Sequence, residues 1–383
     1  MHEKIAYLIK HYVWIQWLYQ FIFSNLMRII GLFVKIDEKL ILLSSYGGKN
    51  YGDSPRVLFE AMKDDHRFAG YKYVWALENG CNHTVDGAEV VTIDSLKYFL
   101  TALKSKVWIT NVNIERGLAF KKKGTIYINT WHGTGPKKGG NAVAGRKDYD
   151  FSRVDILCID GRYMHDVMLR YFGADEGSFL YSGRPREDEL FRFTEEDRLR
   201  IRNQLGIGKS KKIILYMPTW REYEAQKINY SLWREMLGDN YVVLVRAHHF
   251  AKDAEFIGDD KFFIDVTKYA NVNELYLIAD FLISDYSSAF FDYGLLGKPM
   301  FCFAYDYDRY VKEYGLFMDL ASEFPRGITK TEKQLLTAIK HVDYEQYAKE
   351  CSDYCHSYVA HDGQATQACL KRLKELLDGD GFI

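Results

Sequence analysis

The sequence lacks an excess of charge of either sign. Its 51 lysine and arginine residues are balanced by 52 aspartate and glutamate residues, which leaves a formal net charge of −1. Non-specific binding to nucleic acid depends on a strongly basic surface. The balanced charge therefore excludes binding to nucleic acid through the overall charge of the protein. Any anion-binding site must therefore be local.

Cysteine pairs with metal-binding or redox spacing are also missing. The six cysteines, at positions 81, 158, 302, 351, 355 and 369, form no C-x-x-C motif. We find no signal peptide with a cleavage site, no internal repeat and no low-complexity segment. We therefore expect free thiols in a reducing cytoplasm, because disulfide scaffolds are usually short and dense in cysteine.

No uninterrupted run of about 20 apolar residues, the length of a transmembrane helix, occurs in the chain. The nearest approach is Ile5 to Ile36, which is rich in aromatic residues but carries Lys10, Arg28 and Lys35. Aromatic and basic side chains on an amphipathic helix suit the headgroup region of a bilayer. We predict an in-plane helix that contacts the membrane; packing on the protein's own core or on another subunit and a true span are the alternatives.

The chain does contain enough apolar residues for two globular domains. It has 383 residues, of which 48% are hydrophobic and 16% aromatic, and one core rarely serves that length. Buried strands alternate with helices, which predicts parallel sheets of the α/β class. The expected strands are Lys39–Ser45, Tyr73–Leu77, Glu89–Thr92, Val107–Thr110, Thr125–Asn129, Ile156–Ile159, Lys211–Met217, Tyr241–Val245, Phe262–Asp265, Phe281–Ile283 and Met300–Phe303; the expected helices are Arg56–Lys63, Ser95–Lys104, Tyr163–Tyr171, Val272–Ala279 and a charged amphipathic helix over Ala368–Leu377.

A glycine-rich loop, Tyr46 to Pro55, follows the first expected strand. Glycine at the end of a strand lets a ligand approach the backbone, so Asn50 and Asp53 are candidate ligand contacts. Asp53 or Ser54 is also a candidate cap for the helix that Pro55 begins.

A second loop of the first half reads INTWHGTGPKKGG over Ile128–Gly140. His132 lies beyond a strand end, where the ligand crevice of a doubly wound sheet is lined, and it is a candidate general base; a hydrogen-bonded structural histidine is the alternative. Glycine lets a ligand approach the backbone closely, and the lysine ammonium attracts phosphate. The candidate phosphate or acceptor contacts in this loop are Gly133, Thr134, Lys137 and Lys138.

Cations follow two strand ends in the second half. Arg221 is either a ligand-binding cation or the partner of Glu222 or Glu224 in a surface ion pair. The next strand ends in Arg246, His248 and His249, which without further spaced ligands are poor evidence for zinc.

The stretch from Phe281 to Phe303 reads as strand, helix and strand, with S-D-Y-S-S at the start of the helix. Unpartnered N–H groups and the helix dipole favour a phosphate there. Ser287 and Ser288 are therefore candidates for phosphate binding, and the alternative is that Asp285, Ser287 or Ser288 only caps the helix. For the following D-x-D of Asp306 and Asp308 we expect a solvated acidic loop rather than a metal site.

Four segments in this order resemble the CDP-glycerol glycerophosphotransferase family of bacterial teichoic-acid synthesis. They are NTWHGTGPKK (Asn129–Lys138), LYMPTWRE (Leu215–Glu222), VLVRAHH (Val243–His249) and ISDYSSAFFDYGLLGKP (Ile283–Pro299). The chain carries His249 where family members often carry proline.

The resemblance implies two Rossmann-like domains that face a cleft, a GT-B-like fold. With the membrane-contacting segment over 1–36, we expect an acceptor-side domain over 37–186, a nucleotide-donor domain over 187–350 and a helical tail over 351–383. By resemblance, His132 and His248 are the catalytic candidates, and the donor phosphates are bound by Arg221, Arg246, Asp285, Ser287 and Ser288.

The implied reaction transfers glycerol phosphate from CDP-glycerol to a hydroxyl of an undecaprenyl-diphosphate-linked disaccharide and releases CMP. It would occur at the cytoplasmic side of the cell membrane, on a peripheral enzyme that binds no nucleic acid. Mg²⁺ is a possible aid, although no ligand cluster for a metal is visible, and an oligomer is possible. The modest length favours a primase over a polymerase. The alternatives are a poly(glycerol phosphate) or ribitol phosphate polymerase, a sugar-nucleotide glycosyltransferase of the same architecture, and a non-catalytic, membrane-docked scaffold that binds nucleotides.

Overall fold

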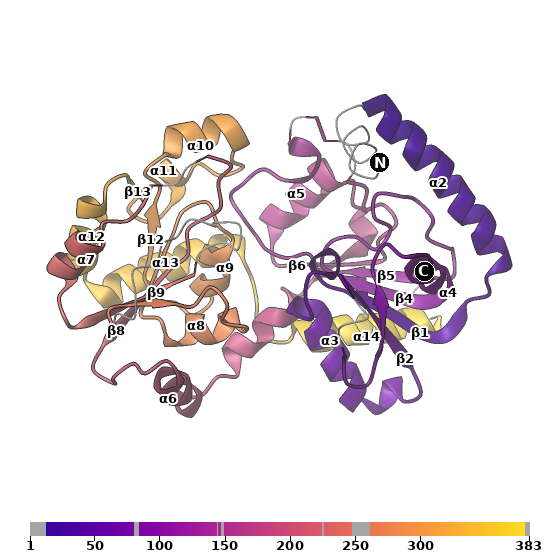
Figure 1. The fold of residues 1–383 in the computed structure, drawn as a ribbon, viewed down its shortest axis with the longest axis horizontal. Coiled ribbons are helices and arrows are strands. Elements are labelled where there is room, and N and C mark those ends of the chain that lie inside the picture. Colours follow the sequence, from indigo (N-terminus) through magenta and orange to yellow (C-terminus); the bar gives the residue numbers. More distant parts are fainter. Residues whose placement is uncertain are drawn as a thin grey trace.

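The computed structural model of the protein contains two parallel β-sheets, one in each half of the chain (Figure 1). It describes residues 13–79, 84–143, 145–146, 149–223, 226–246 and 261–379. His248 and His249, and the beginning of the apolar N-terminal segment, lie outside the described residues. The α/β class predicted from the sequence is confirmed.

The first sheet has seven strands in the order β3-β2-β1-β4-β5-β6-β7. They are β1 (Asp37–Ser44), β2 (Lys72–Leu77), β3 (Glu89–Thr92), β4 (Ser105–Thr110), β5 (Ile126–Asn129), β6 (Ile156–Ile159) and β7 (Phe179–Tyr181). Its helices are α3 (Asp53–Asp64), α4 (Leu96–Lys104) and α5 (Arg162–Phe172), with short turns η1 (Tyr46–Gly48), η2 (His66–Phe68), η4 (Gly140–Ala142) and η5 (Glu176–Ser178). The strand order reverses between β1 and β4, and ligands bind at such a point in open α/β sheets.

The second sheet has six strands in the order β10-β9-β8-β11-β12-β13. They are β8 (Lys212–Tyr216), β9 (Tyr241–Val245), β10 (Phe263–Asp265), β11 (Phe281–Ser284), β12 (Met300–Phe303) and β13 (Ile328–Thr329). Its helices are α6 (Glu195–Gln204), α7 (Tyr230–Leu237), α8 (Val272–Ile278), α9 (Ala289–Gly294), α10 (Tyr307–Tyr314), α11 (Leu320–Glu323), α12 (Glu332–His341) and α13 (Tyr344–Tyr358). Here the strand order reverses between β8 and β11. The loops after these two strands therefore correspond to the loops after β1 and β4 in the first sheet.

Apolar runs account for the central strands. Leu40, Leu42 and Leu43 of β1 are buried, and neighbouring residues of one strand point to opposite faces of the sheet. Helices must therefore cover both faces, as is usual for parallel sheets. On one of these faces the cover includes the last helix, α14 (Ala365–Asp378), whose Cys369 and Leu370 pack into the first sheet's core.

The chain passes between the sheets twice. It leaves the first sheet through η6 (Pro185–Phe191) and returns between α13 and α14. The ribbon of α14, in yellow, accordingly lies under the half that contains the N-terminal strands (Figure 1). The domain limits expected from the sequence stay predictions.

Most predicted elements are found with ends shifted by a few residues. Helix α9 is short, and Gly294 at its end packs closely on α13, where an added Cβ would lie 2.7 Å from the Cys355 Sγ. The edge strands β7 and β13 were not predicted. The five described cysteines are free and buried, in agreement with the expectation of free thiols.

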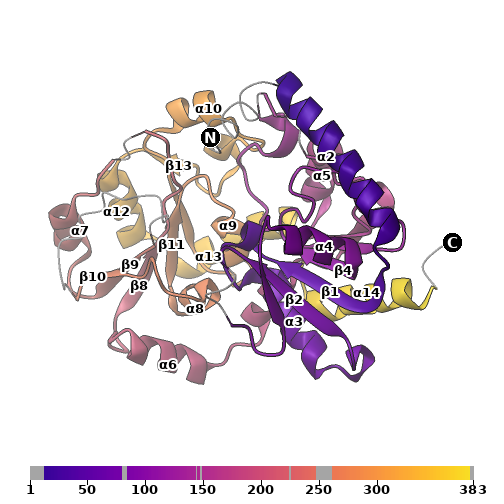
Figure 2. The ribbon, with the colours of Figure 1, turned by 45° about the vertical axis from the view of Figure 1, so that its right-hand side comes forward.

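Helix α2 (Val13–Phe33) runs along the outside of the first half in both ribbon views (Figures 1 and 2). Its inner side is fixed by Ser24, whose Oγ accepts a hydrogen bond from Ala119 N at 3.0 Å, and by Arg28, whose Nε donates to Ala119 O at 2.7 Å. Its outer side leaves large apolar residues exposed, among them Trp17 at 62% and Phe33 at 86%. Among the described residues no helix meets the length and apolarity that crossing a membrane requires.

Candidate active site

The loops at the carboxyl ends of the two sheets touch each other. A Cβ added to Gly133, after β5, would lie 2.6 Å from the Oγ of Ser288, after β11. Further along, Lys138 N donates to Gly315 O at 3.1 Å, and Phe317 N donates to Pro136 O at 2.6 Å. The predicted histidine loop and the predicted phosphate-binding turn are therefore direct neighbours, and Gly133 serves this close approach.

His132 is held in one orientation and one tautomer. Its Nδ1 lies 2.8 Å from the carbonyl oxygen of Asn111, and since a carbonyl can only accept, Nδ1 carries the hydrogen. The ring also packs on Trp131 with 4.0 Å between the centroids. This leaves Nε2 with the lone pair that a general base needs.

The surroundings of His132 keep it neutral. Burial lowers its pKa below the ordinary value; the hydrogen bond with Asn111 and the charge of Asp53 oppose this, while the nearby guanidinium of Arg186 lowers the pKa further. A neutral imidazole at physiological pH is ready to accept a proton.

Arg186 connects the two halves at this point. Its Nη1 donates to Asp53 Oδ2 at 2.8 Å and to the carbonyl oxygen of His132 at 3.1 Å. Its Nη2 donates to both carboxylate oxygens of Asp292 on α9, at 2.9 and 2.8 Å. One guanidinium thus joins the glycine-rich loop, the histidine loop and a helix of the second sheet.

Asp53, a predicted ligand contact, is fully engaged inside the protein. Besides Arg186 it accepts hydrogen bonds from Tyr46 OH and from Ser54 N, both at 2.7 Å. Burial would raise its pKa, but the charge of Arg186 and these hydrogen bonds outweigh burial and lower it. Asn50, from the same loop, is exposed.

Thr134 belongs to a second buried network. Its hydroxyl donates to Asp160 Oδ2 and accepts from Arg184 Nη1 at 3.2 Å. Arg184 also donates to Asp160 at 2.6 Å and to Glu187 Oε1 at 2.8 Å, and burial raises the pKa of Glu187. The side chain of Thr134 therefore supports the loop from inside rather than facing a ligand.

The two predicted lysines differ in their surroundings. The Lys137 ammonium lies 4.5 Å from the ring centroid of Tyr314 and 5.8 Å from that of Tyr310, both on α10. Burial lowers its pKa. Lys138 is exposed. Of these two lysines, Lys137 is the one that is partly removed from water, and a cation in that environment attracts an anion more strongly than one in water.

The turn after β11 combines local capping with contact across the halves. Ser287 Oγ accepts a hydrogen bond from Ala289 N at 3.1 Å, as the capping alternative requires, while Ser288 contacts Gly133. Asp285 accepts from Thr219 N at 2.9 Å and from Tyr286 N at 2.8 Å. Its remaining oxygen accepts from Arg221, so Asp285 shapes the turn.

Arg221 is buried and pairs with two aspartates, whereas Glu224, one of the partners considered from the sequence, lies outside the described residues. Its guanidinium donates to Asp285 at 2.9 Å and to Asp306 Oδ1 at 2.9 Å. Burial opposes its charge, but the bonds to Asp306 and the charge of Asp285 outweigh burial and raise its pKa. The expectation of a solvated loop at Asp306 was wrong, since Tyr286 OH also donates to this carboxylate at 2.9 Å. Through these two aspartates, Arg221 joins the turn after β11 to the loop after β12.

Arg246 directly follows β9 and has no countercharge among the described residues. Its Nη1 donates to the carbonyl oxygens of Val266 at 3.1 Å and Tyr269 at 2.7 Å, and within the described residues no carboxylate pairs with it. Burial lowers its pKa, as expected for a cation without an ionic partner. Because it follows β9, it lies where a phosphate would be bound.

Buried polar atoms without partners mark the first sheet's reversal point. Ser44 Oγ, Ser45 Oγ and Asn111 Nδ2 make no hydrogen bond within the described part of the chain. Such atoms are costly unless water or a ligand satisfies them. Over the same residues, no group of His, Cys, Asp or Glu could hold a metal ion.

Sequence reasoning missed Arg184, Arg186, Asp160 and Asp292. The signal for the two arginines was present, since G-R-P-R follows the end of β7, at the limit expected for the first domain. Asp292 lies within an apolar helical stretch, where an acidic residue needs a partner if it is buried.

Comparison with known proteins places these features in a family. The model of the CDP-Glycerol:Poly(glycerophosphate) glycerophosphotransferase family matches residues 26–375. A teichoic acid poly(glycerol phosphate) polymerase of Staphylococcus epidermidis is 34% identical over 87% of the chain and 50% of its own length. A teichoic acid glycerol-phosphate transferase of Staphylococcus aureus is 32% identical over 86% of the chain and 92% of its own length.

A solved structure shows the same fold. The wall teichoic acid polymerase TagF superposes with a TM-score of 0.81 at 32% identity, covering 94% of this chain and 94% of the polymerase chain. The chain therefore spans about half of one full-length polymerase and nearly all of the part of TagF in that structure.

The first prediction concerns the proton affinity of His132. We expect its pKa, measured by NMR titration of the ring, to lie below the ordinary value of about 6.5. Arg186→Met should raise it, because a positive charge that disfavours the imidazolium is removed. A pKa above about 7 in the unaltered protein would contradict this description.

The second prediction concerns stability. Arg186→Met should lower the free energy of unfolding by about 3–5 kcal/mol, because Asp53 and Asp292 keep their charges without a partner. Urea denaturation measures the change. The matched control is Arg162→Met, which removes an exposed pair with Asp166 and should cost less than about 1 kcal/mol. Equal losses in both variants would show that the Arg186 pairs contribute little.

Proposed function

The chain belongs to the CDP-glycerol:poly(glycerophosphate) glycerophosphotransferase family, and on that premise we propose that it transfers glycerol phosphate from CDP-glycerol to a hydroxyl of a prenyl-diphosphate-linked glycan. The observation that supports this most strongly is the contact between the His132 loop and the Ser288 turn. Such a transfer requires a base that can accept a proton and, opposite it, groups that hold the phosphate, and the two loops come from different sheets.

In the proposed step, the acceptor hydroxyl oxygen forms a bond to the glycerol-linked phosphorus of CDP-glycerol. The bond from that phosphorus to the bridging oxygen breaks, and CMP leaves with the bonding electrons. Nε2 of His132 accepts the hydroxyl proton, for which its fixed tautomer is suited. His248, the other catalytic candidate, lies outside the described residues.

Charge on the transferring group needs compensation in this step. Arg246 supplies a cation without an ionic partner among the described residues, and Lys137 supplies a partly desolvated ammonium. Ser287 and Ser288 contribute the turn on which the diphosphate would rest. Arg221 and Asp285 hold that turn through their mutual hydrogen bond at 2.9 Å.

We further propose that α2 attaches the enzyme to the cytoplasmic face of the cell membrane. A prenyl-linked acceptor resides in the bilayer, so the enzyme must work at its surface. The outer side of α2 offers Trp17, Phe21 and Leu32, all exposed, to the headgroup region.

The transfer itself is tested by product mass. Purified protein is incubated with CDP-glycerol and a disaccharide on a short prenyl diphosphate, and we expect the acceptor mass to rise by whole glycerol phosphate units. One added unit supports a primase, and a series supports a polymerase. His132→Ala should slow transfer about 10²–10⁴-fold while CDP-glycerol still binds.

Other products would redirect the assignment. Transfer from CDP-ribitol alone would identify the other polyol as donor, and release of UDP or GDP from a sugar nucleotide would identify a glycosyltransferase. If the protein binds nucleotide but transfers nothing from any of these donors, it acts as a non-catalytic scaffold, and the proposal is overturned.

Membrane attachment is tested by co-sedimentation with anionic lipid vesicles. The double variant Trp17→Ser, Phe21→Ser should bind at least about tenfold more weakly, because two large apolar side chains no longer enter the interface. The matched control is Leu199→Ser with Tyr181→Ser, two exposed residues that lie on α6 and β7. Equal binding by all three proteins would rule out attachment through this face.

A further inference from the structure

A cavity of about 320 Å³ opens beside the glycine-rich loop, at the carboxyl ends of β1 and β2. It therefore lies at the ligand-binding edge of the first sheet. None of the residues to which the proposed step gives a role lines it. The lining residues are Gly48, Lys49, Asn50, Tyr51, Glu60, Lys63, Leu77, Thr84, Val85 and Asp86.

The loop between this cavity and His132 is held in a conformation that its residues do not prefer. Tyr46 and Asp53 have φ angles of 49° and 58°, in the left-handed region that side chains other than glycine rarely adopt. Tyr46 N donates to Asn111 Oδ1 at 2.8 Å, and Glu78 N donates to Gly48 O at 2.7 Å. Strain that surrounding bonds maintain in this way is typical of functional sites.

The two sides of this loop face different places. On one side, the Tyr46 ring lies 5.9 Å from the His132 ring, and Asp53 pairs with Arg186. On the other side, Gly48 to Tyr51 line the cavity. A group in the cavity is thus separated from the candidate base by one loop.

The wall of the cavity has the chemistry of a sugar site. The Tyr51 ring is fixed by edge contacts with Trp75 at 4.8 Å and Phe59 at 6.3 Å, and it remains 36% exposed. The side chain of Asn50 has no hydrogen-bond partner among the described residues, and Glu60 accepts from Tyr51 OH at 3.1 Å. A pyranose ring offers an apolar face to an aromatic ring and hydroxyls to amide and carboxylate groups.

The charges in the cavity argue against a phosphate there. Lys63 donates to Asp86 Oδ2 at 2.5 Å and Glu60 is a further carboxylate, so the lining holds acidic groups beside its lysines. A nucleotide diphosphate would need an excess of positive charge. The cavity is instead polar and nearly neutral.

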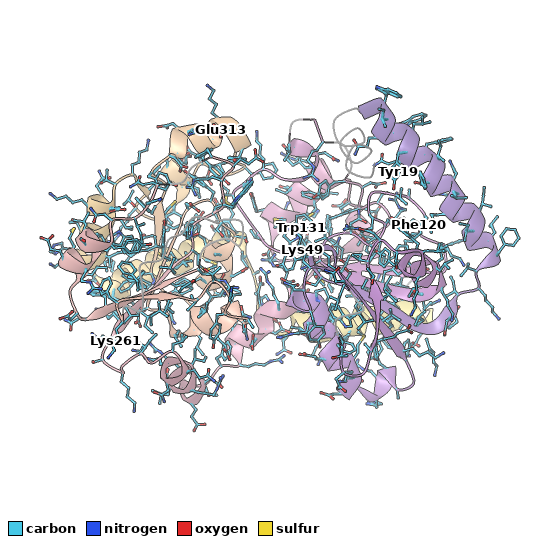
Figure 3. All side chains as sticks on the ribbon, viewed as in Figure 1. Tyr19, Lys49, Phe120, Trp131, Lys261 and Glu313 are labelled. Atoms are coloured by element: carbon cyan, nitrogen blue, oxygen red, sulfur yellow. The ribbon has the colours of Figure 1, made fainter. Side chains whose placement is uncertain are left out.

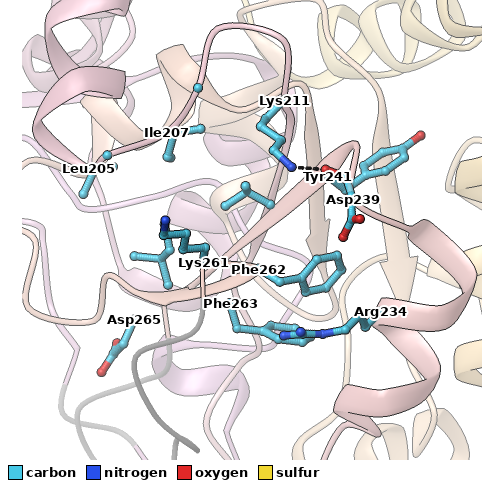
Figure 4. Close-up of a pocket in the computed structure, with 14 residues that line it drawn as sticks. Leu205, Ile207, Lys211, Arg234, Asp239, Tyr241, Lys261, Phe262, Phe263 and Asp265 are labelled. Carbon is cyan, nitrogen blue, oxygen red and sulfur yellow. Dashed lines mark hydrogen bonds between the residues drawn. The ribbon is translucent and has the colours of Figure 1, made fainter.

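A second cavity, of about 920 Å³, is placed wrongly for a substrate of the His132 site (Figure 4). Lys211, Tyr241 and Lys261 line it, which places it at the amino ends of β8, β9 and β10, the end of the sheet away from the ligand loops. Lys261 lies on the outer side of the second half, whereas Lys49 and Trp131 lie toward the middle of the molecule (Figure 3).

We propose that the cavity beside Tyr51 binds a pyranose ring of the acceptor and so brings the acceptor hydroxyl toward His132. The inference rests on the proposed function for the identity of the acceptor. It makes Tyr51 the stacking platform and Asn50 a hydrogen-bonding group for that ring.

The test compares Tyr51→Ala, which removes the ring, with Tyr51→Phe, which keeps it. The substrates are CDP-glycerol and a disaccharide on a short prenyl diphosphate. Tyr51→Ala should raise the KM for the acceptor about tenfold and leave the KM for CDP-glycerol within about twofold. Tyr51→Phe should stay within about threefold of the unaltered enzyme, and the control Tyr181→Ala, an exposed tyrosine of β7, should change neither constant.

Two kinetic results would overturn the inference. One is an unchanged acceptor KM in Tyr51→Ala. The other is an equal rise of both constants, which would show that the substitution only disturbs the loop.

Saturation-transfer NMR with the free disaccharide and no donor separates this inference from the proposed function. The unaltered protein should give a signal that Tyr51→Ala loses. If that holds while no polyol donor supports transfer, the proposed function fails and the sugar site stands. If the unaltered protein gives no signal although transfer proceeds, the sugar site is wrong and the proposed function stands.

Discussion

The buried ion pairs of Arg186 are the interaction on which the rest of the site depends. The guanidinium lies between Asp53 of the first half and Asp292 of the second, with 13% of its side chain exposed. Charges this far from water must be paired, so a separation of the halves at this point would leave a carboxylate or the arginine without its partner. The same side chain also holds the carbonyl oxygen of His132. The position of the candidate base is therefore coupled to the contact between the sheets.

The cations of the site fall into two groups according to whether a buried carboxylate pairs with them. Arg184, Arg186 and Arg221 are neutralised by buried carboxylates and shape the walls of the site. Arg246 and Lys137 have no such partner within the described residues and remain able to attract an anion. A ranking by sequence position alone would treat Arg221 and Arg246 as equivalent, because both follow strand ends; burial and pairing distinguish them.

The sequence was sufficient for the features that depend on local pattern. The central strands, the helix α2 and the place of His132 at a strand end all follow from apolar runs and from the glycine and lysine residues nearby. It was insufficient where partners are distant: Arg186 meets Asp53 and Asp292 across separations of 133 and 106 residues, and Arg221 meets Asp306 across 85. Nothing local marks Asp306 as buried, so the solvated loop expected there was wrong. The edge strands β7 and β13 are too short to carry a pattern.

The central claim is that the donor's reacting phosphate lies beside the contact between the His132 loop and the Ser288 turn, within reach of both. A crystal structure with bound CDP-glycerol measures this directly. The account predicts that the glycerol-linked phosphorus faces Nε2 of His132, with the diphosphate oxygens against the Ser287–Ser288 turn and within reach of Arg246. A diphosphate bound away from both loops, for example in the cavity lined by Lys211 and Lys261, would contradict it.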